Sequence, residues 1–109
     1  MQFNVALIPY GGGTNVTWAL KCVETETRML CSVDVTRMNH VRWVDRTNMT
    51  AFVEAGIIGK DLEKELSRYG VCCGHEPDSV EFSSLGGWIS TRASGMKKNR
   101  YGNIEDIVL

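Results

Sequence analysis

Three consecutive glycines, Gly11–Gly13, most strongly limit what this chain can fold into. They follow a short apolar run over residues 3–8, which Pro9 closes, and they precede Thr14 and Asn15. An apolar run that ends at a proline and a glycine cluster is typical of a buried strand leading into a loop. Because glycine has no Cβ, the loop backbone can turn sharply and approach another group closely. The sequence therefore predicts a strand followed by a tightly turning loop.

The chemistry of this loop suits an oxyanion. Successive backbone N–H groups can point into one concavity, and a loop at the end of a strand is a common place for a phosphate. A Walker loop is excluded because no lysine followed by Ser or Thr comes after Gly13. The dinucleotide pattern GxGxxG fits Gly11 and Gly13, but valine occupies position 16. A glycine-rich turn without any ligand explains the motif equally well.

The remaining pattern mixes strands and helices. Alternation over residues 29–35 predicts a half-buried strand, with Met, Cys and Val on one side. Polar residues 45–48 lie between β-branched and aromatic runs, which predicts a hairpin. Apolar residues recur at helical spacing from Ile58 to Tyr69, and Gly70 stands where a C-terminal cap belongs. A further short helix is expected within residues 83–93. Without a regular βαβ repeat, the expected class is α+β.

Charge and cysteine content exclude several classes of protein. The net charge of −1 argues against a general nucleic-acid or membrane-surface binder, which would carry a basic excess. No segment has the apolar length of a transmembrane helix. The start of the chain has neither a basic region nor a small-residue cleavage site typical of a signal peptide. No metal site is expected, because the cysteines fit no zinc spacing and we interpret them as free, partly buried thiols. They are Cys22, Cys31, Cys72 and Cys73.

A second stretch, EPDSVEFSSLGGWISTRASG, is dense in hydroxyl groups and glycine. Such a loop can wrap a polar cofactor through neutral hydrogen bonds. Arg92 either neutralises charge on a ligand or makes a structural ion pair, and Trp88 is expected in the core. The hydroxyl residues are Ser79, Ser83, Ser84, Ser90, Thr91 and Ser94.

Three segments carry a resemblance to a known family. PYGGGTNV, NMTAFVEAGIIGKDLEKEL and GHEPDSVEFSSLGGWISTRASGMKKNRYGNIEDIV resemble the alkyldihydroxyacetonephosphate synthases, the flavoenzymes of ether-lipid synthesis. The resemblance covers residues 7–109, and its most specific run is STRASGMKKNRYGNIED. It implies an α+β fold, the vanillyl-alcohol-oxidase/p-cresol-methylhydroxylase-type FAD-binding domain, central part only.

The resemblance also implies which residues hold FAD, without a covalent link. Two departures from the family pattern are Tyr10, in place of an aliphatic residue, and Ser84, in place of threonine. Neither change obviously forbids FAD. The first segment comprises Pro9, Tyr10, Gly11, Gly12, Gly13, Thr14 and Asn15; the second comprises Asp78, Ser79, Val80, Glu81, Phe82, Ser83 and Ser84; the third comprises Thr91, Arg92, Ala93 and Ser94.

The activity that the resemblance implies is a transferase reaction. Acyl-dihydroxyacetone phosphate exchanges its fatty acid for a fatty alcohol in a peroxisomal enzyme, and a homodimer is an assembly that the resemblance allows. We expect residues 1–109 to be a partial FAD-binding domain, incomplete at both ends, because an EGTLG-like segment and the substrate domain are missing. No catalytic residue is therefore expected in this chain. The alternatives are an FAD-dependent 2-hydroxy-acid dehydrogenase of the same superfamily, or a truncated product without activity.

Histidines and basic residues outside these segments have plain structural interpretations. His75 matches the family's GHEP run, and we expect it to orient the loop through Glu76 or a backbone carbonyl. For His40 the sequence suggests no partner. The basic cluster at residues 97–100 is interpreted as a solvated loop.

Overall fold

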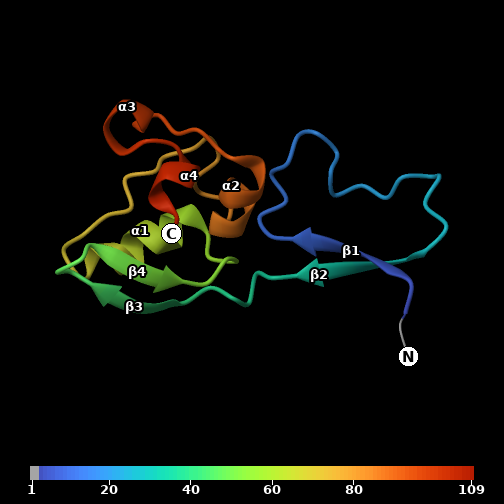
Figure 1. Ribbon diagram of the computed structural model, residues 1–109, viewed down its shortest axis with the longest axis horizontal. Helices are drawn as coiled ribbons and strands as arrows, with labels where there is room; N and C mark the ends of the chain where they lie inside the picture. Colours follow the sequence, from blue (N-terminus) through green and yellow to red (C-terminus); the bar gives the residue numbers. More distant parts are fainter. Residues whose placement is uncertain (1–2) are drawn as a thin grey trace.

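The structure is a computed structural model that describes residues 3–109. Within these residues the strands come first and the helices follow, in an α+β arrangement that confirms the expected class. The strands form two separate sheets, one parallel and one antiparallel, which lie end to end in Figure 1. The elements are β1 (Val5–Tyr10), β2 (Met29–Asp34), β3 (Val41–Asp45), β4 (Thr50–Val53), α1 (Gly59–Ser67), α2 (Leu85–Thr91), α3 (Lys98–Tyr101) and α4 (Ile104–Ile107).

Strand β1 leads into the glycine loop, as the sequence predicts. It pairs in parallel with β2, so that both strands end at the same edge of their sheet. The expectation that this strand is buried is wrong, because none of its residues is buried and Leu7 is 65% exposed. The pairing extends beyond the apolar run, through Pro9 opposite Val33 to Tyr10 opposite Asp34. Proline is compatible with an edge strand, where its missing N–H need not serve a second neighbour.

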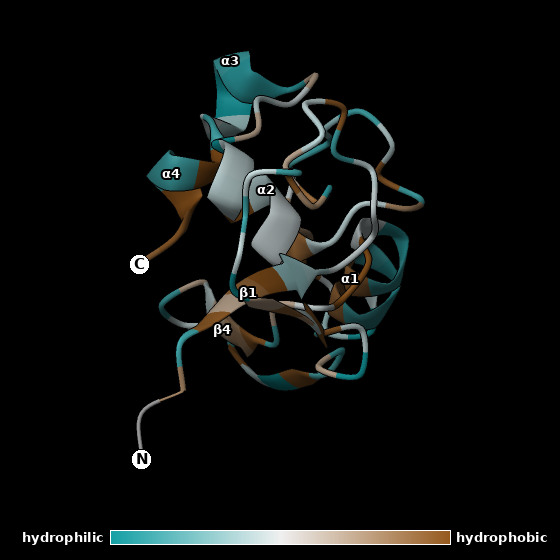
Figure 2. Cartoon of the chain, turned by 90° about the vertical axis from the view of Figure 1, so that its right-hand side faces the viewer, coloured by the Kyte–Doolittle hydropathy of each residue, from teal (hydrophilic) through white to brown (hydrophobic). Residues whose placement is uncertain are grey.

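The expectation that β2 is half-buried is also wrong. Met29 is 73% exposed and Val33 is 38% exposed, although both lie on the apolar side of the alternating pattern. The helices of residues 3–109 gather around the other sheet, and β1 lies apart from them in Figure 1. Figure 2 looks at the end of the molecule that carries β1 and shows the apolar residues of this strand in brown. Alternation identifies a face that can be buried, but burial requires a second layer to cover it.

The hairpin and the first helix form as predicted. Strand β3 pairs antiparallel with β4, and the Asp45 carboxylate accepts the backbone N–H of Thr47 at 2.8 Å in the turn. Helix α1 ends before Gly70, which has a positive φ of 70°. The N–H of Val71 then donates to the carbonyl of Leu66, which completes a Schellman cap.

The core lies between the β3–β4 hairpin and helices α1, α2 and α4. The short helix expected within residues 83–93 is α2, and Trp88 on it is buried, as expected. A Cβ added to Gly59 would lie 2.5 Å from the Trp88 ring, so the first turn of α1 rests directly on the indole. No helix among the described residues is long and apolar enough to cross a membrane. The fully or nearly fully buried apolar residues are Ile57, Leu62, Leu66, Trp88 and Ile104.

A crowded glycine joins the parallel sheet to the hairpin unit. The chain that leaves β2 runs beside the chain that leaves β4, and the N–H of Gly56 donates to the carbonyl of Met38 at 2.8 Å. A Cβ on Gly56 would lie 1.8 Å from the carbonyl oxygen of Val35. Only glycine fits here, so the glycine loop after β1 is held at a defined position beside the core.

Candidate cofactor site

The glycine loop presents a row of backbone donors that the protein itself does not use. Among the hydrogen bonds of residues 3–109, none takes the N–H of Gly11, Gly12, Gly13 or Thr14. Gly13 has a φ of 70°, a conformation that turns successive N–H groups toward a common side. The Tyr10 hydroxyl lies 2.8 Å from where a Cβ on Gly13 would stand, so the tyrosine folds back over the loop.

The loop packs directly against the second predicted segment. A Cβ on Gly12 would lie 1.9 Å from the carbonyl oxygen of Phe82, and one on Gly11 would lie 2.3 Å from the Ser84 Oγ. The structure therefore brings together segments about seventy residues apart in the chain, a distance that only tertiary packing can close. This contact accounts for glycine at positions 11 and 12 without reference to any ligand.

Two hydroxyl groups of the second segment, those of Ser83 and Ser84, are hydrogen-bonded inside the protein. Ser83 Oγ accepts the indole N–H of Trp88 at 2.7 Å, and Ser84 Oγ accepts the backbone N–H of Gly87 at 3.3 Å as the N-cap of α2. Both serines are buried. Ser79 has a left-handed φ of 57°, and its carbonyl accepts two backbone N–H groups of the following turn.

Other members of this segment face different surroundings. Val80 packs against the core, whereas the Phe82 side chain is 66% exposed. Asp78 and Glu81 make no side-chain hydrogen bond among residues 3–109. Whether these residues bind FAD stays a prediction.

The N-terminus of α2 is not an available anion site. Its first N–H groups donate to the carbonyl of Ile57, the carbonyl of Ala55 and the hydroxyl of Ser84. A helix whose first-turn donors are all satisfied has none left for a phosphate. In the glycine loop, by contrast, the backbone N–H groups of residues 11–14 have no partner among the described residues.

The third predicted segment makes contacts of its own. Thr91 Oγ1 donates to the carbonyl of Gly87 at 2.9 Å, and Arg92, with a left-handed φ of 51°, pairs with Glu105 at 2.9 Å. The structure thus contains the ion pair that the sequence left open for Arg92. Ala93 is half-buried and donates its N–H to the carbonyl of Trp88 at 2.9 Å.

Asn15 and Ser94 are the last residues of the first and third predicted segments. Asn15 Oδ1 accepts the backbone N–H groups of Thr17 and Ala19 and the Thr17 hydroxyl. Its amide nitrogen makes no hydrogen bond within the described part of the chain, and neither does the Ser94 hydroxyl. These two groups remain available as donors at the rim of the site.

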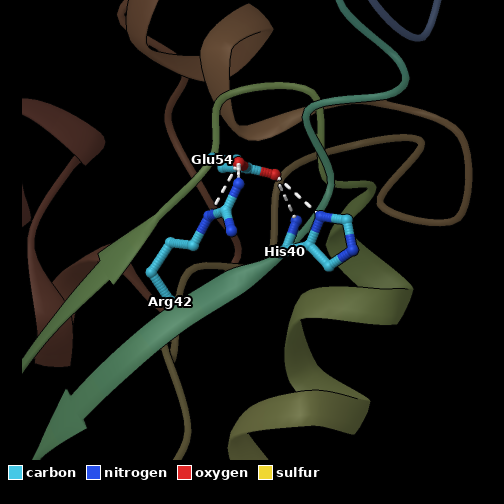
Figure 3. A network of polar contacts seen from close by, with 3 residues as sticks. All are labelled: His40, Arg42 and Glu54. Atoms are coloured by element: carbon cyan, nitrogen blue, oxygen red, sulfur yellow. Dashed lines mark hydrogen bonds and ion pairs between the residues drawn. The ribbon is translucent and has the colours of Figure 1, made fainter.

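Sequence patterns did not reveal a strong polar cluster outside these segments. Glu54 accepts the backbone N–H of His40 at 2.9 Å and contacts the His40 ring at 3.0 Å, and it also pairs with Arg42 (Figure 3). The His40 donors and Arg42 lower the pKa of Glu54 to about 2. The cluster fixes the start of β3 to the end of β4, so its role is structural. The sequence at residues 40–42 does not indicate that His40 and Arg42 share Glu54 as their partner.

Two further observations limit what the site can be. The four cysteines are free, as expected, but three are exposed and only Cys73 is half-buried. No group of His, Cys, Asp and Glu within residues 3–109 could hold a metal ion. An apolar cavity of about 410 Å³ lies between the hairpin and α4, and none of the predicted FAD residues lines it.

Comparisons with known proteins also indicate an FAD-binding domain. A family described as "FAD binding domain" matches residues 1–109. Alkyldihydroxyacetonephosphate synthase of Caenorhabditis elegans is 58% identical over 109 residues, which are 100% of this chain and 18% of that protein. The synthase of Dictyostelium discoideum is 50% identical over 108 residues, 99% of this chain and 18% of that protein.

A solved structure gives the same result. A structure titled "alkyldihydroxyacetonephosphate synthase in P212121" has a TM-score of 0.91 and 52% identity, and the match covers 95% of this chain and 19% of that one. The chain therefore spans about a fifth of the length of the relatives that it matches.

Proposed function

The chain belongs to the FAD-binding domain family, and we propose that residues 1–109 are the central part of the FAD-binding domain of an alkyldihydroxyacetonephosphate synthase. One observation carries the proposal: the unused N–H groups of residues 11–14 lie at the end of β1, held in place against the backbone of Phe82. The 58% identity to a synthase favours this family over the hydroxy-acid dehydrogenase alternative.

The loop binds the FAD pyrophosphate through backbone dipoles. Residues 9–17 contain no lysine or arginine, so the charge of a diphosphate would be stabilised by N–H donors at close range. A hydrogen bond to a charged group contributes about 1.5–3 kcal/mol. Two or three such bonds suffice to anchor the phosphates while the rest of the cofactor is oriented by other contacts.

The proposed reaction exchanges the fatty acid of acyl-dihydroxyacetone phosphate for a fatty alcohol. FAD supplies the reactive flavin ring at which this exchange takes place. Residues 1–109 bind and orient the cofactor, and proton transfer belongs to residues elsewhere in the polypeptide. We therefore expect the isolated 109-residue chain to have no transferase activity.

The test uses the complete polypeptide that contains this chain. Titration with FAD, followed by quenching of flavin fluorescence, should show binding, and labelled fatty alcohol should be incorporated as acyl-dihydroxyacetone phosphate releases its fatty acid. Oxidation of 2-hydroxy acids with a dye acceptor, without alcohol incorporation, would instead establish the dehydrogenase. Absence of FAD binding would overturn the proposal as a whole.

Location and assembly are part of the same proposal. By family resemblance we place the enzyme in the peroxisome, and we take a homodimer as its assembly. Fluorescence microscopy of the tagged full-length protein beside a peroxisomal marker checks the first point. Light scattering during size-exclusion chromatography checks the second.

A further inference from the structure

His75 is a buried imidazole without polar partners. It is 1% exposed, and neither ring nitrogen has a hydrogen-bond partner among the described residues. The expected contact of His75 with Glu76 or a backbone carbonyl is therefore absent from residues 3–109. A buried ring in this position is tolerated only when it is uncharged, because an unpaired buried cation is far more costly than an unpaired neutral group.

The ring of His75 packs against Trp88. The two ring centroids are 5.3 Å apart and the planes are tilted by 60°. Trp88 also rests on Gly59 and donates its indole N–H to Ser83 Oγ at 2.7 Å. The packing of His75 against the indole therefore limits the orientations that Trp88 can take.

The position of Trp88 affects the glycine loop through Ser83, which accepts its indole N–H. Ser83 is joined to Phe82 and Ser84, whose carbonyl oxygen and hydroxyl crowd Gly12 and Gly11. We propose that His75 is a positioning residue for FAD, an uncharged ring that holds Trp88 and, through it, the Phe82–Ser84 backbone against the pyrophosphate loop. This inference rests on the proposed function.

Residues 74–76 also contact the chain that follows the third predicted segment. The Tyr101 ring lies 2.8 Å from where a Cβ on Gly74 would stand, and the N–H of Met96 donates to the carbonyl of Glu76 at 2.8 Å. The Glu76 carboxylate pairs with Lys97. A displacement of His75 would therefore disturb the residues that follow the third predicted segment as well as Trp88.

Charged groups around His75 determine how it responds to acid. Burial lowers the pKa of His75, and Glu105 on α4, which is itself paired with Arg92, opposes this effect. From α1, Glu63 accepts the N–H of Cys73, whose thiol is half-buried. Because the folded pKa lies below the unfolded value of about 6.5, the stabilisation is present above that pH and lost as the pH falls.

The experiment measures FAD retention by the complete holoprotein between pH 8 and pH 5. Wild type should release flavin as the pH falls, whereas His75→Phe, whose ring cannot take up a proton, should release it at a pH lower by at least about 1 unit. The control His40→Phe changes an exposed histidine and should follow the wild-type curve. A wild-type curve without pH dependence, or His75→Phe following wild type, overturns the inference.

A second measurement decides the question if His75→Phe does not fold. Exchange of the histidine C2 hydrogen in wild-type holoprotein, followed by mass spectrometry, reports the protonation of His75 directly. Its midpoint should lie below the ordinary value of about 6.5, and a midpoint at or above that value overturns the inference. Failure of wild type to bind FAD even at pH 8 would instead refute the proposed function.

Discussion

Substitution of Gly12 by alanine tests the geometry of the pyrophosphate loop most directly. The new Cβ would lie 1.9 Å from the carbonyl oxygen of Phe82, so one backbone must retreat by about 1 Å or more. Overpacking of this kind costs about 1–3 kcal/mol of stability. A hydrogen bond of about 2.9 Å stretched by 1 Å no longer forms. Losing one bond to a charged phosphate lowers FAD affinity by about 10- to 100-fold.

The assay compares the FAD dissociation constant and the thermal midpoint of the full-length variant with those of wild type. Gly87→Ala is the matched control, because its Cβ would meet only the Ser84 hydroxyl, at 3.2 Å, and alanine favours a helix by about 1 kcal/mol over glycine. The control should keep its FAD affinity and lose no stability. Unchanged affinity in Gly12→Ala, or an equal loss in Gly87→Ala, would refute the reasoning.

Three further predictions concern the scaffold. Glu54→Gln should lower the thermal midpoint at pH 7 and make the midpoint depend less on acid. The reason is that a carboxylate with a pKa of about 2 contributes stability above its ordinary pKa of 4.5 and loses it as the pH falls through 2. A constant difference between the thermal midpoints of wild type and variant from pH 7 to pH 2 would contradict this. Trp88→Phe leaves the Ser83 hydroxyl without its indole donor and should cost about 1–3 kcal/mol in urea unfolding, whereas Trp43→Phe, at a half-exposed position, should cost about 0.5 kcal/mol or less; equal costs would count against the buried bond. Burial raises the pKa of the Cys73 thiol, so it should react most slowly with a thiol reagent read by mass spectrometry, a result that equal rates for all four cysteines would exclude.

Local signals in the sequence were sufficient for the hairpin and for α1. The polar turn at residues 45–48 and the glycine at position 70 act through bonds to their immediate neighbours, so pattern and structure agree. The strand at residues 29–34 is also present, but its exposure was not predictable. Whether an alternating face is buried depends on a covering layer, which alternation does not specify.

The family and the cofactor were predictable because long specific runs carry them. The resemblance to the synthases is confirmed by 58% and 50% identity over the whole chain, and FAD by the family that matches residues 1–109. The part that each residue takes in FAD binding was not settled in the same way. It stays a prediction for each residue named in the three segments.

The chemistry of the site shows why residue type alone was insufficient. Hydroxyl density suggested that serine and threonine side chains hold the cofactor, yet the hydroxyls of Ser83, Ser84 and Thr91 have partners inside the protein. Within residues 3–109, the backbone N–H groups of residues 11–14 have no partner, and neither do the Asn15 amide nitrogen and the Ser94 hydroxyl. Only packing decides which donors are already satisfied, and for the same reason the sequence does not predict the contact between Glu54 and His40.

The contact between Gly12 and Phe82 has a consequence for the order in which the molecule assembles. Contacts within residues 41–69 join positions that are near one another in the chain, so the hairpin and α1 can form early. The contact between Gly12 and Phe82 joins positions about seventy residues apart and therefore carries a larger entropic cost. The cradle for the cofactor is therefore expected to close late, after the rest of the fold is in place. A newly made chain would first reach a folded state without flavin. FAD binding would then stabilise the contact between the glycine loop and residues 82–84.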